Sequence, residues 1–201
     1  MTAVLSATGD DKYLFFLPIS VWSWNQIGVR CLIFHPARLN GDPRFELAKK
    51  NCRGDTIFAA FTCAPEAEVT YAQMSRLFGA ALPVLPHDEI LITADIDMLV
   101  FGDYFKQKSD YIDIFGADLM QGQEQYPMCY ISMTQELWWY VMRMGTYSYQ
   151  QLLDFALWKE LVNHDMRGNL WSRDQELIYQ MIRMSELPVQ TYSRRNAAGF
   201  A

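Results

Sequence analysis

The sequence predicts an α/β fold in which a mostly parallel central sheet is flanked by helices. Short runs of β-branched and aromatic residues alternate along the chain with longer segments whose apolar residues recur at helical spacing. One of the runs, at positions 90–94, is apolar almost throughout, which is typical of a strand buried on both faces. The chain has 201 residues, of which 51% are hydrophobic, and this size suits one domain with a sizeable core. We therefore expect residues 1–201 to form a single domain.

The first half of the chain is predicted to alternate strands with helices. After a polar start, strands are expected at 13–19, 29–34, 56–62 and 90–94. A short helix is expected at 45–51, and a longer one begins at Pro65 and continues over 71–82. The longer helix is indicated by apolar residues at positions i, i+3, i+4 and i+7, namely Met74, Leu77, Phe78 and Ala81.

The second half is less regular. Strands are expected at 111–115 and 129–133, and a short helix or a loop at 103–108. Amphipathic patterns predict helices at 135–144, 149–162 and 174–184. Thr134 is suited to cap the first of these helices, because a threonine hydroxyl can accept a hydrogen bond from a free backbone N–H of the first turn.

Composition and charge exclude several classes of partner. The formal net charge is −6 and the isoelectric point is about 5.0, which argues against nucleic acid or an anionic membrane surface as the main partner. The chain contains no run of about 18 apolar residues, so we expect no membrane span, and its first residues do not form a signal peptide. We expect a soluble, cytoplasmic protein whose four dispersed cysteines are reduced thiols and bind no zinc.

Two carboxylates follow the buried strand at 90–94. Asp95 and Asp97 are one residue apart, at the point where the strand should end. Open parallel sheets bind their ligands at the carboxyl ends of the strands. Two hard oxygen donors on one short segment can hold a divalent cation, which in turn can hold a phosphate. The alternative is that both residues cap the following turn and bind nothing.

Four segments, taken in order, resemble the GT-A-fold glycosyltransferases that use nucleotide-sugar donors. They are the first expected strand with its loop, the helix before the carboxylates, the Asp-x-Asp motif itself and a late segment, at 13–20, 71–78, 92–99 and 171–177. The resemblance covers most of the chain and is closest to bacterial and large-virus enzymes, including the chlorovirus capsid glycosyltransferases. It implies a nucleotide-binding half at about 10–102 and an acceptor and sugar half at about 103–201. If the chain is viral, the cytoplasm is that of the host.

The resemblance also implies which residues bind a UDP-sugar donor. Arg76 should reach the donor or the first carboxylate of the motif, and Asp55 should contact uracil or ribose. A surface or structural salt bridge for Arg76 and a simple turn for Asp55 are the alternatives. Arg194 is expected to close over the pyrophosphate, unless the tail is merely solvated. Three residues at the end of the first expected strand should seat the nucleobase, namely Pro18, Ile19 and Ser20.

The metal and the catalytic residues are assigned in the same way. Asp97 is the expected metal ligand, and Asp95 should bind ribose or the metal; Mn²⁺ or Mg²⁺ fits an all-oxygen site. A third protein ligand is not found, because the chain has no histidine after His164. Asp174 and Gln175 should lie beside the anomeric carbon of the sugar, which favours a retaining reaction. A role for Asp174 as a helix N-cap is the alternative.

The expected function is therefore metal-dependent transfer of a hexose or deoxyhexose from a UDP-sugar to a glycan or glycoprotein acceptor. A binding module for nucleotide sugars or carbohydrates, without turnover, is one alternative. An Asp-x-Asp phosphatase or phosphotransferase is another, although in those enzymes the motif usually follows the first strand, whereas here it follows several.

Overall fold

A computed structural model of the chain describes residues 1–102, 111–120, 122–163 and 172–193, with the backbone alone for 158–163. Its centre is a seven-stranded sheet with the strand order β3-β2-β1-β4-β6-β5-β7. Neighbouring strands are parallel except at β6, which is antiparallel to both β4 and β5. The strands are β1 (Thr2–Ser6), β2 (Arg30–Pro36), β3 (Thr56–Phe61), β4 (Ile90–Thr93), β5 (Ile112–Phe115), β6 (Ile131–Thr134) and β7 (Val189–Tyr192). The expected mostly parallel sheet is confirmed.

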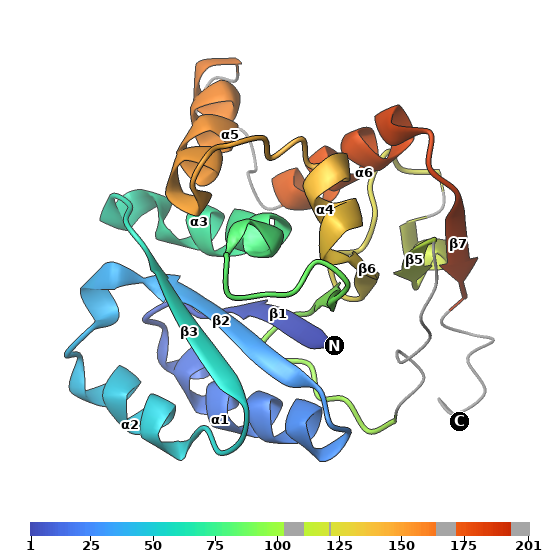
Figure 1. The fold of residues 1–201 in the computed structure, drawn as a ribbon. Coiled ribbons are helices and arrows are strands. Elements are labelled where there is room, and N and C mark those ends of the chain that lie inside the picture. The colour runs from blue at the N-terminus through green and yellow to red at the C-terminus, as the bar shows by residue number, and fades with distance from the viewer. Residues whose placement is uncertain (103–110, 121, 164–171, 194–201) are drawn as a thin grey trace.

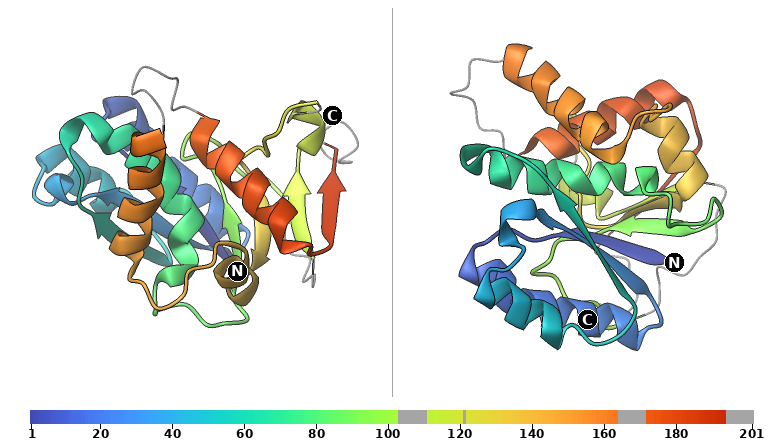
Figure 2. Two further views of the ribbon diagram at one scale, coloured as in Figure 1. Left: turned by 90° about the horizontal axis from the view of Figure 1, so that it is seen from above. Right: turned by 60° about the vertical axis from the view of Figure 1, so that its left-hand side comes forward.

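Helices cover both faces of the sheet (Figure 1 and Figure 2). Two helices, α1 and α2, lie on one face, and four helices, α3 to α6, lie on the other. The first pair is α1 (Asp11–Gln26) and α2 (Pro43–Asn51). The other four are α3 (Glu68–Ser75), α4 (Gln135–Val141), α5 (Tyr149–Asn163) and α6 (Arg173–Ser185). None of the helices within the described residues is long and apolar enough to cross a membrane.

Alternate residues of the central strands supply two separate cores. Val4 and Leu32 pack into the cluster on the side of α3 to α6, together with Trp138 of α4. Leu5 and Ile33, their immediate neighbours, pack into the cluster on the side of α1 and α2. A strand points successive side chains to opposite faces, so one short strand can anchor both helical layers. This explains why the central strands are apolar throughout.

The strand expected at 13–19 is wrong, because these residues lie in α1. The helix begins after Asp10, whose carboxylate accepts a hydrogen bond from the backbone N–H of Lys12. Its buried residues Leu14, Leu17, Val21 and Trp24 recur at helical spacing. The buried positions form one face of the helix, whereas Phe15 is 66% exposed, so the aromatic and apolar run around Pro18 is part of a helix and not a strand.

The first strand of the sheet lies instead in the stretch read as a polar start. It is β1 (Thr2–Ser6), which pairs with β2 on one side and β4 on the other. This strand begins with Thr2 and ends with Ser6, so its apolar run is only three residues long and is a weak signal in the sequence. The first strand thus begins about ten residues earlier than the sequence predicted. The segment 7–13, which follows it, lies next to the carboxylates after β4.

The remaining expected elements are mostly confirmed. Strands β2 to β6 and helices α2, α4, α5 and α6 lie close to their expected bounds, and the Thr134 hydroxyl accepts a hydrogen bond from Leu137 N–H as expected for a cap. The long helix expected from Pro65 is divided into η2 (Pro65–Ala67), α3 and the 3-10 helix η3 (Arg76–Ala81). The short, largely exposed edge strand β7 was missed. The segment 103–108 lies outside the described residues.

Candidate functional site

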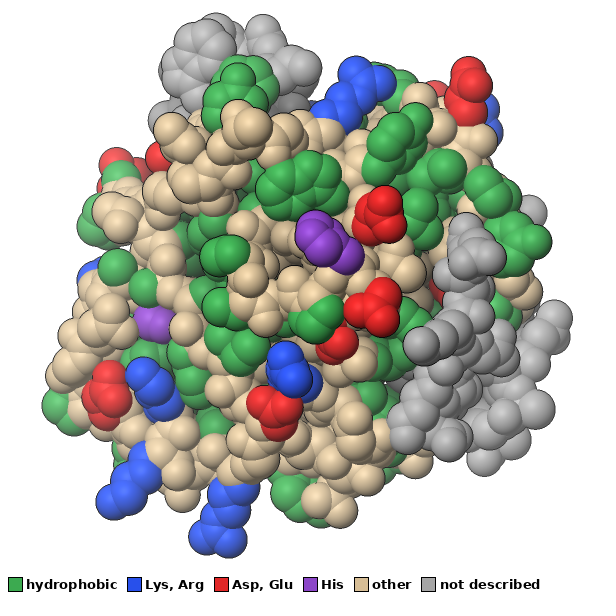
Figure 3. Space-filling model, in the orientation of Figure 1, with side chains coloured by type: hydrophobic (Ala, Val, Ile, Leu, Met, Phe, Trp, Pro, Cys, Tyr) green, Lys and Arg blue, Asp and Glu red, His purple; other side chains and the backbone are tan. Residues whose placement is uncertain are grey.

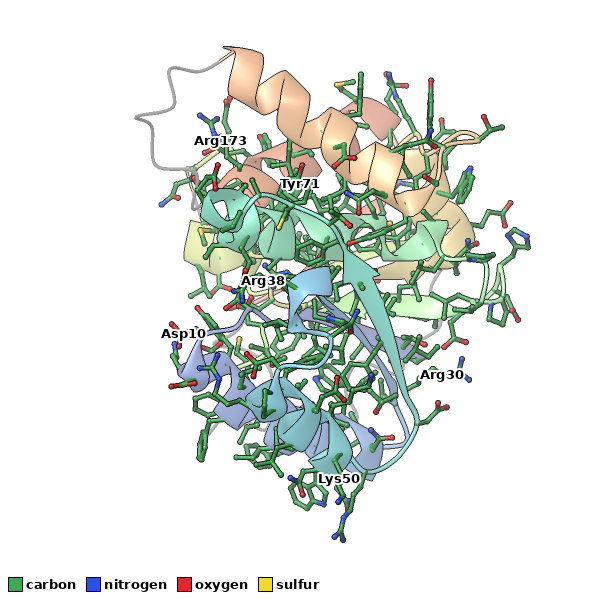
Figure 4. The ribbon with its side chains drawn as sticks, turned by 90° about the vertical axis from the view of Figure 1, so that its left-hand side faces the viewer. Asp10, Arg30, Arg38, Lys50, Tyr71 and Arg173 are labelled. Carbon is green, nitrogen blue, oxygen red and sulfur yellow. The ribbon has the colours of Figure 1, made fainter. Side chains whose placement is uncertain are left out.

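A cavity of about 390 Å³ lies where β1 and β4 end. Its walls come from the loop and first turn that follow β1, from α3 and Arg76, from the segment after β4, from η4 (Ala117–Met120) with the nearby residues 127–129, and from the start of α6. Because β1 and β4 are neighbouring parallel strands, the segments that follow them meet at the carboxyl ends of these strands. In Figure 4, Asp10, Arg38 and Arg173, from three of the segments near these strand ends, lie toward one side of the view.

Arg76 joins two of the predicted site residues. Its side chain is 6% exposed, and its Nη2 donates to Asp174 Oδ2 at 2.9 Å. Its Nη1 donates to the Asp95 carboxylate and to the carbonyl oxygen of Ala94, the latter at 3.2 Å. The planar guanidinium carries several donors in a fixed arrangement, so one arginine can fix two carboxylates that come from different elements. The structure shows Arg76 at the first carboxylate of the motif, which is one of its two expected partners, and the same buried ion pair fits the alternative of a structural salt bridge.

Burial and charge pull the pKa values of this cluster in opposite directions. Burial acts to lower the pKa of the Arg76 guanidinium, but Asp95 and Asp174 outweigh it and raise the pKa. Burial raises the pKa of Asp174, and the opposing effects of Arg76 and of the Gln175 backbone N–H do not cancel it. Asp174 is therefore a carboxyl group in a place that water barely reaches, and it takes up a proton more readily than an exposed aspartate.

Asp97 is held by a different cation. Lys12 Nζ lies 2.9 Å from Asp97 Oδ2, and both side chains line the cavity. A backbone hydrogen bond from Met98 N–H to Asp95 O closes the turn that carries both carboxylates. Within the part of the chain that the structure describes, Asp95 Oδ2 and Asp97 Oδ1 have no hydrogen-bond or ion-pair partner. Each carboxylate thus keeps one oxygen available to a ligand.

These two oxygens fit a hard divalent cation as part of a ligand set. Carboxylate oxygens suit Mg²⁺ and Mn²⁺, which commonly complete their coordination with water and substrate phosphates. Among the residues with described positions, no group of three His, Cys, Asp or Glu side chains could hold a metal ion. Asp95 and Asp97 would therefore be the protein's contribution here, and His164 lies outside the described residues.

Asp174 and Gln175 both reach the cavity from the first turn of α6. Ser172 occupies the N-cap position of this helix, so the alternative role of Asp174 as its N-cap is wrong. Asp174 Oδ1 instead accepts a hydrogen bond of 2.9 Å from the Gln175 backbone N–H. The side-chain oxygen of Gln175 is buried and has no hydrogen-bond partner in the described structure. A buried amide oxygen without a partner is costly unless a ligand supplies a donor.

The loop after β1 is the part of the site that the sequence analysis missed. Thr8, Lys12 and Tyr13 line the cavity from this loop and from the start of α1. Gly9 N–H donates to Glu68 Oε1 at 3.0 Å, and Glu68 in turn is paired with Arg38. The sequence did contain a signal, because Thr-Gly-Asp-Asp after a short apolar run combines a turn glycine with a helix N-cap.

Comparison with known proteins concerns the fold. No protein family model matches the chain, and no curated protein matches it in sequence. Among solved structures it is similar to the galactosyltransferase LgtC, determined in complex with donor and acceptor sugar analogues, with a TM-score of 0.54 and 13% identity over 95% of this chain and 73% of that one. The chain has a GT-A-type fold.

A second similar structure is the apo form of the glycosyltransferase GlyE of Streptococcus pneumoniae. Its TM-score is 0.48 and its identity 10%, over 94% of this chain and 44% of that one. The likeness to LgtC, at 13% identity, establishes the GT-A-type fold alone. The activity of this chain has to be argued from its own residues.

The GT-A-type fold separates several predicted donor residues from the cavity. Pro18, Ile19 and Ser20 lie inside α1 and do not line it, so their expected place at the end of a strand is wrong. The buried hydroxyl of Ser20 donates to the carbonyl oxygen of Met98 at 3.4 Å. Asp55 precedes β3 and therefore lies at the amino ends of the parallel strands, away from the cavity at their carboxyl ends. There it pairs with Arg30 at 2.9 Å. Arg194 lies outside the described residues.

The face of the molecule drawn in Figure 3 shows no basic patch of the kind that a polyanion partner would need. On the face drawn in Figure 3, the described Lys and Arg side chains are interspersed with Asp and Glu and do not gather into one basic patch. This matches the net charge of −6. Among the described residues, a buried cluster of charged side chains, Arg76 with Asp95 and Asp174, lies at the cavity.

Proposed function

We propose that this chain is a metal-dependent glycosyltransferase that moves a hexose or deoxyhexose from a UDP-sugar to a glycan or glycoprotein acceptor with retention of configuration. The observation that carries the proposal is the Arg76 cluster. One buried guanidinium binds Asp95 and Asp174, and both carboxylates face a cavity that Asp97 and Gln175 also line. The cavity lies at the carboxyl ends of parallel strands in a GT-A-type fold, which is where open α/β sheets bind ligands.

The charges of the cavity support the need for a metal. Its ionised side chains are the cations Lys12 and Arg76 and the anions Asp95, Asp97 and Asp174. Among the described residues that line the cavity, the anions outnumber the cations by one, so their summed charge disfavours a diphosphate. A divalent cation bound by Asp95 and Asp97 reverses that balance. In addition, it would offset the negative charge that develops on the diphosphate as the glycosidic bond breaks.

The residues at the start of α6 are suited to the sugar. Asp174 is buried and anionic, so it can stabilise positive charge that develops at the anomeric carbon. Arg76 fixes the position of Asp174 relative to Asp95. Gln175 offers a buried amide oxygen that can accept a hydrogen bond from a sugar hydroxyl. A neighbouring anion and an amide acceptor on the sugar side favour retention.

A thermal-shift panel of nucleotides and nucleotide sugars, with and without Mn²⁺, tests the proposal. UDP and UDP-sugars should raise the melting temperature only when Mn²⁺ is present, because ligand binding to the native state stabilises it. Asp97→Asn should abolish the shift. Asp88→Asn is a matched control, since it removes the same charge from an exposed residue at the opposite end of β4. Absence of any metal-dependent shift with UDP would contradict the proposal.

The same samples separate the alternatives. A binding module would show the metal-dependent shift with a UDP-sugar but would release no UDP from it, with or without an acceptor. A phosphatase or phosphotransferase would liberate inorganic phosphate or form an aspartyl phosphate. The proposed transferase should release UDP and form neither.

A further inference from the structure

Lys12 occupies an unusual place in the candidate site. It is the second residue of α1, and its Nζ reaches Asp97 Oδ2 across the junction between the segments that follow β1 and β4. The contact measures 2.9 Å, and the Lys12 ammonium also lies 5.1 Å from the centre of the Tyr13 ring. The cation thus holds one oxygen of the carboxylate that we propose as a metal ligand.

The pair is weakly held in comparison with the Arg76 cluster. The Lys12 side chain is 57% exposed and that of Asp97 is 32% exposed, whereas Arg76 is 6% exposed. Exposed lysine–carboxylate pairs contribute little free energy, because water screens the charges and the long side chain loses freedom. Lys12 can therefore leave Asp97 at small cost, while Arg76 stays with Asp95 and Asp174.

We propose that Lys12 is the exchangeable counter-ion of Asp97: it neutralises this carboxylate in the free protein, gives it up when a divalent cation binds, and then contacts the diphosphate of the donor. This inference rests on the proposed function. Two cations cannot share Asp97 without repelling each other, so binding of the metal drives the ammonium away. Because Lys12 lines the cavity, its ammonium can then contact a diphosphate bound there.

The proposal predicts two effects of opposite sign. Loss of the lysine charge removes the competitor for Asp97, so the free protein should bind a divalent cation more tightly. The same loss removes a cation from the donor site, so UDP should bind more weakly once the metal is present. A lysine that serves only to stabilise the start of α1 would produce neither effect.

The experiment measures Mn²⁺ binding to the nucleotide-free protein by electron paramagnetic resonance of the free ion. It then measures UDP binding at saturating Mn²⁺ by calorimetry. Lys12→Met should tighten Mn²⁺ binding about threefold to fivefold and weaken UDP binding about tenfold, whereas Lys12→Arg should stay near the wild type in both. Arg44→Met is the matched control, because Arg44 is a similarly exposed cation beside the start of α1 that pairs with Asp11 and Asp42 outside the cavity.

The outcomes distinguish this inference from the proposed function. If the wild type binds Mn²⁺ and UDP but Lys12→Met behaves like Arg44→Met, the role of Lys12 is refuted and the proposed function stands. Tighter Mn²⁺ binding with unchanged UDP binding refutes the contact with the diphosphate. If the wild type binds neither Mn²⁺ nor UDP, the proposed function fails, and the role of Lys12 fails with it.

Discussion

Arg76 and Asp174 lie 98 residues apart in the sequence and form a buried ion pair, with Nη2 at 2.9 Å from Oδ2. The same guanidinium binds Asp95, which follows β4. Three segments that are remote in sequence, namely the start of η3, the end of β4 and the start of α6, are therefore tied together at the wall of the cavity. This connection couples the stability of the fold to the geometry of the site.

Arg76→Met should destabilise the protein strongly. The substitution leaves Asp174, whose side chain is 1% exposed, without its cation. Removal of one partner of a buried pair typically costs about 3–5 kcal/mol, because the other charge stays buried and uncompensated. Urea unfolding followed by circular dichroism measures the change in the free energy of unfolding. Arg30→Met, which breaks the exposed pair with Asp55, should change it by about 0–1 kcal/mol. Equal effects of the two variants would contradict the central position of Arg76.

Glu68→Ala should disturb the loop after β1, which lines the cavity, and so weaken binding of the proposed donor. Glu68 is buried, and it holds Gly9 in the loop after β1 as well as Arg38. Without its carboxylate, the Gly9 N–H loses its acceptor and the loop loses its anchor, which costs about 1–3 kcal/mol. The variant should bind UDP more weakly at saturating Mn²⁺ while its affinity for Mn²⁺ itself changes little. Calorimetry measures both affinities. Glu66→Ala, an exposed glutamate two residues earlier, is the control, and an identical UDP affinity in both variants would refute this role.

Asp174 should give the stability of the protein a characteristic dependence on pH. Burial raises its pKa above the ordinary value of 3.8, so the native state takes up a proton more readily than the unfolded state. Where the native state binds more protons, the free energy of unfolding falls as the pH rises. Between pH 3.8 and the raised pKa, wild type should therefore lose stability with rising pH relative to Asp174→Asn. Urea unfolding of both proteins across this range tests the sign, which a difference of zero or of opposite slope would contradict.

The local part of the site could be predicted from the sequence. Asp95 and Asp97 follow a strand that is apolar on both faces, and that pattern fixes them at the carboxyl edge of the sheet. The position of Asp55 could also be predicted, because a residue that precedes a parallel strand lies at the end of the sheet away from the carboxyl ends of the strands. The connection of Arg76 with Asp174 is different in kind. It depends on how α6 packs beside α3, whose C-cap residue is Arg76, and neither segment alone encodes that contact.

The main error in the fold concerned α1. The run around Phe15 and Phe16 is aromatic, which favours a strand by composition, and Pro18 disfavours the interior of a helix. The buried positions nevertheless follow a helical period, and Asp10 supplies the cap. Tertiary packing against the sheet stabilises this helix despite the missing N–H of Pro18. With a strand predicted at 13–19, neither β1 nor the loop that follows it could be recognised.

The most direct test of the account is release of UDP from a panel of UDP-hexoses and UDP-deoxyhexoses, measured with Mn²⁺ and with a chelator. We expect UDP release to require the divalent cation, to fall about 100-fold in Asp97→Asn and to be unchanged in Asp88→Asn. Release at the same rate in the chelator, or in Asp97→Asn, would contradict the claim that the carboxylates after β4 form a metal–diphosphate site.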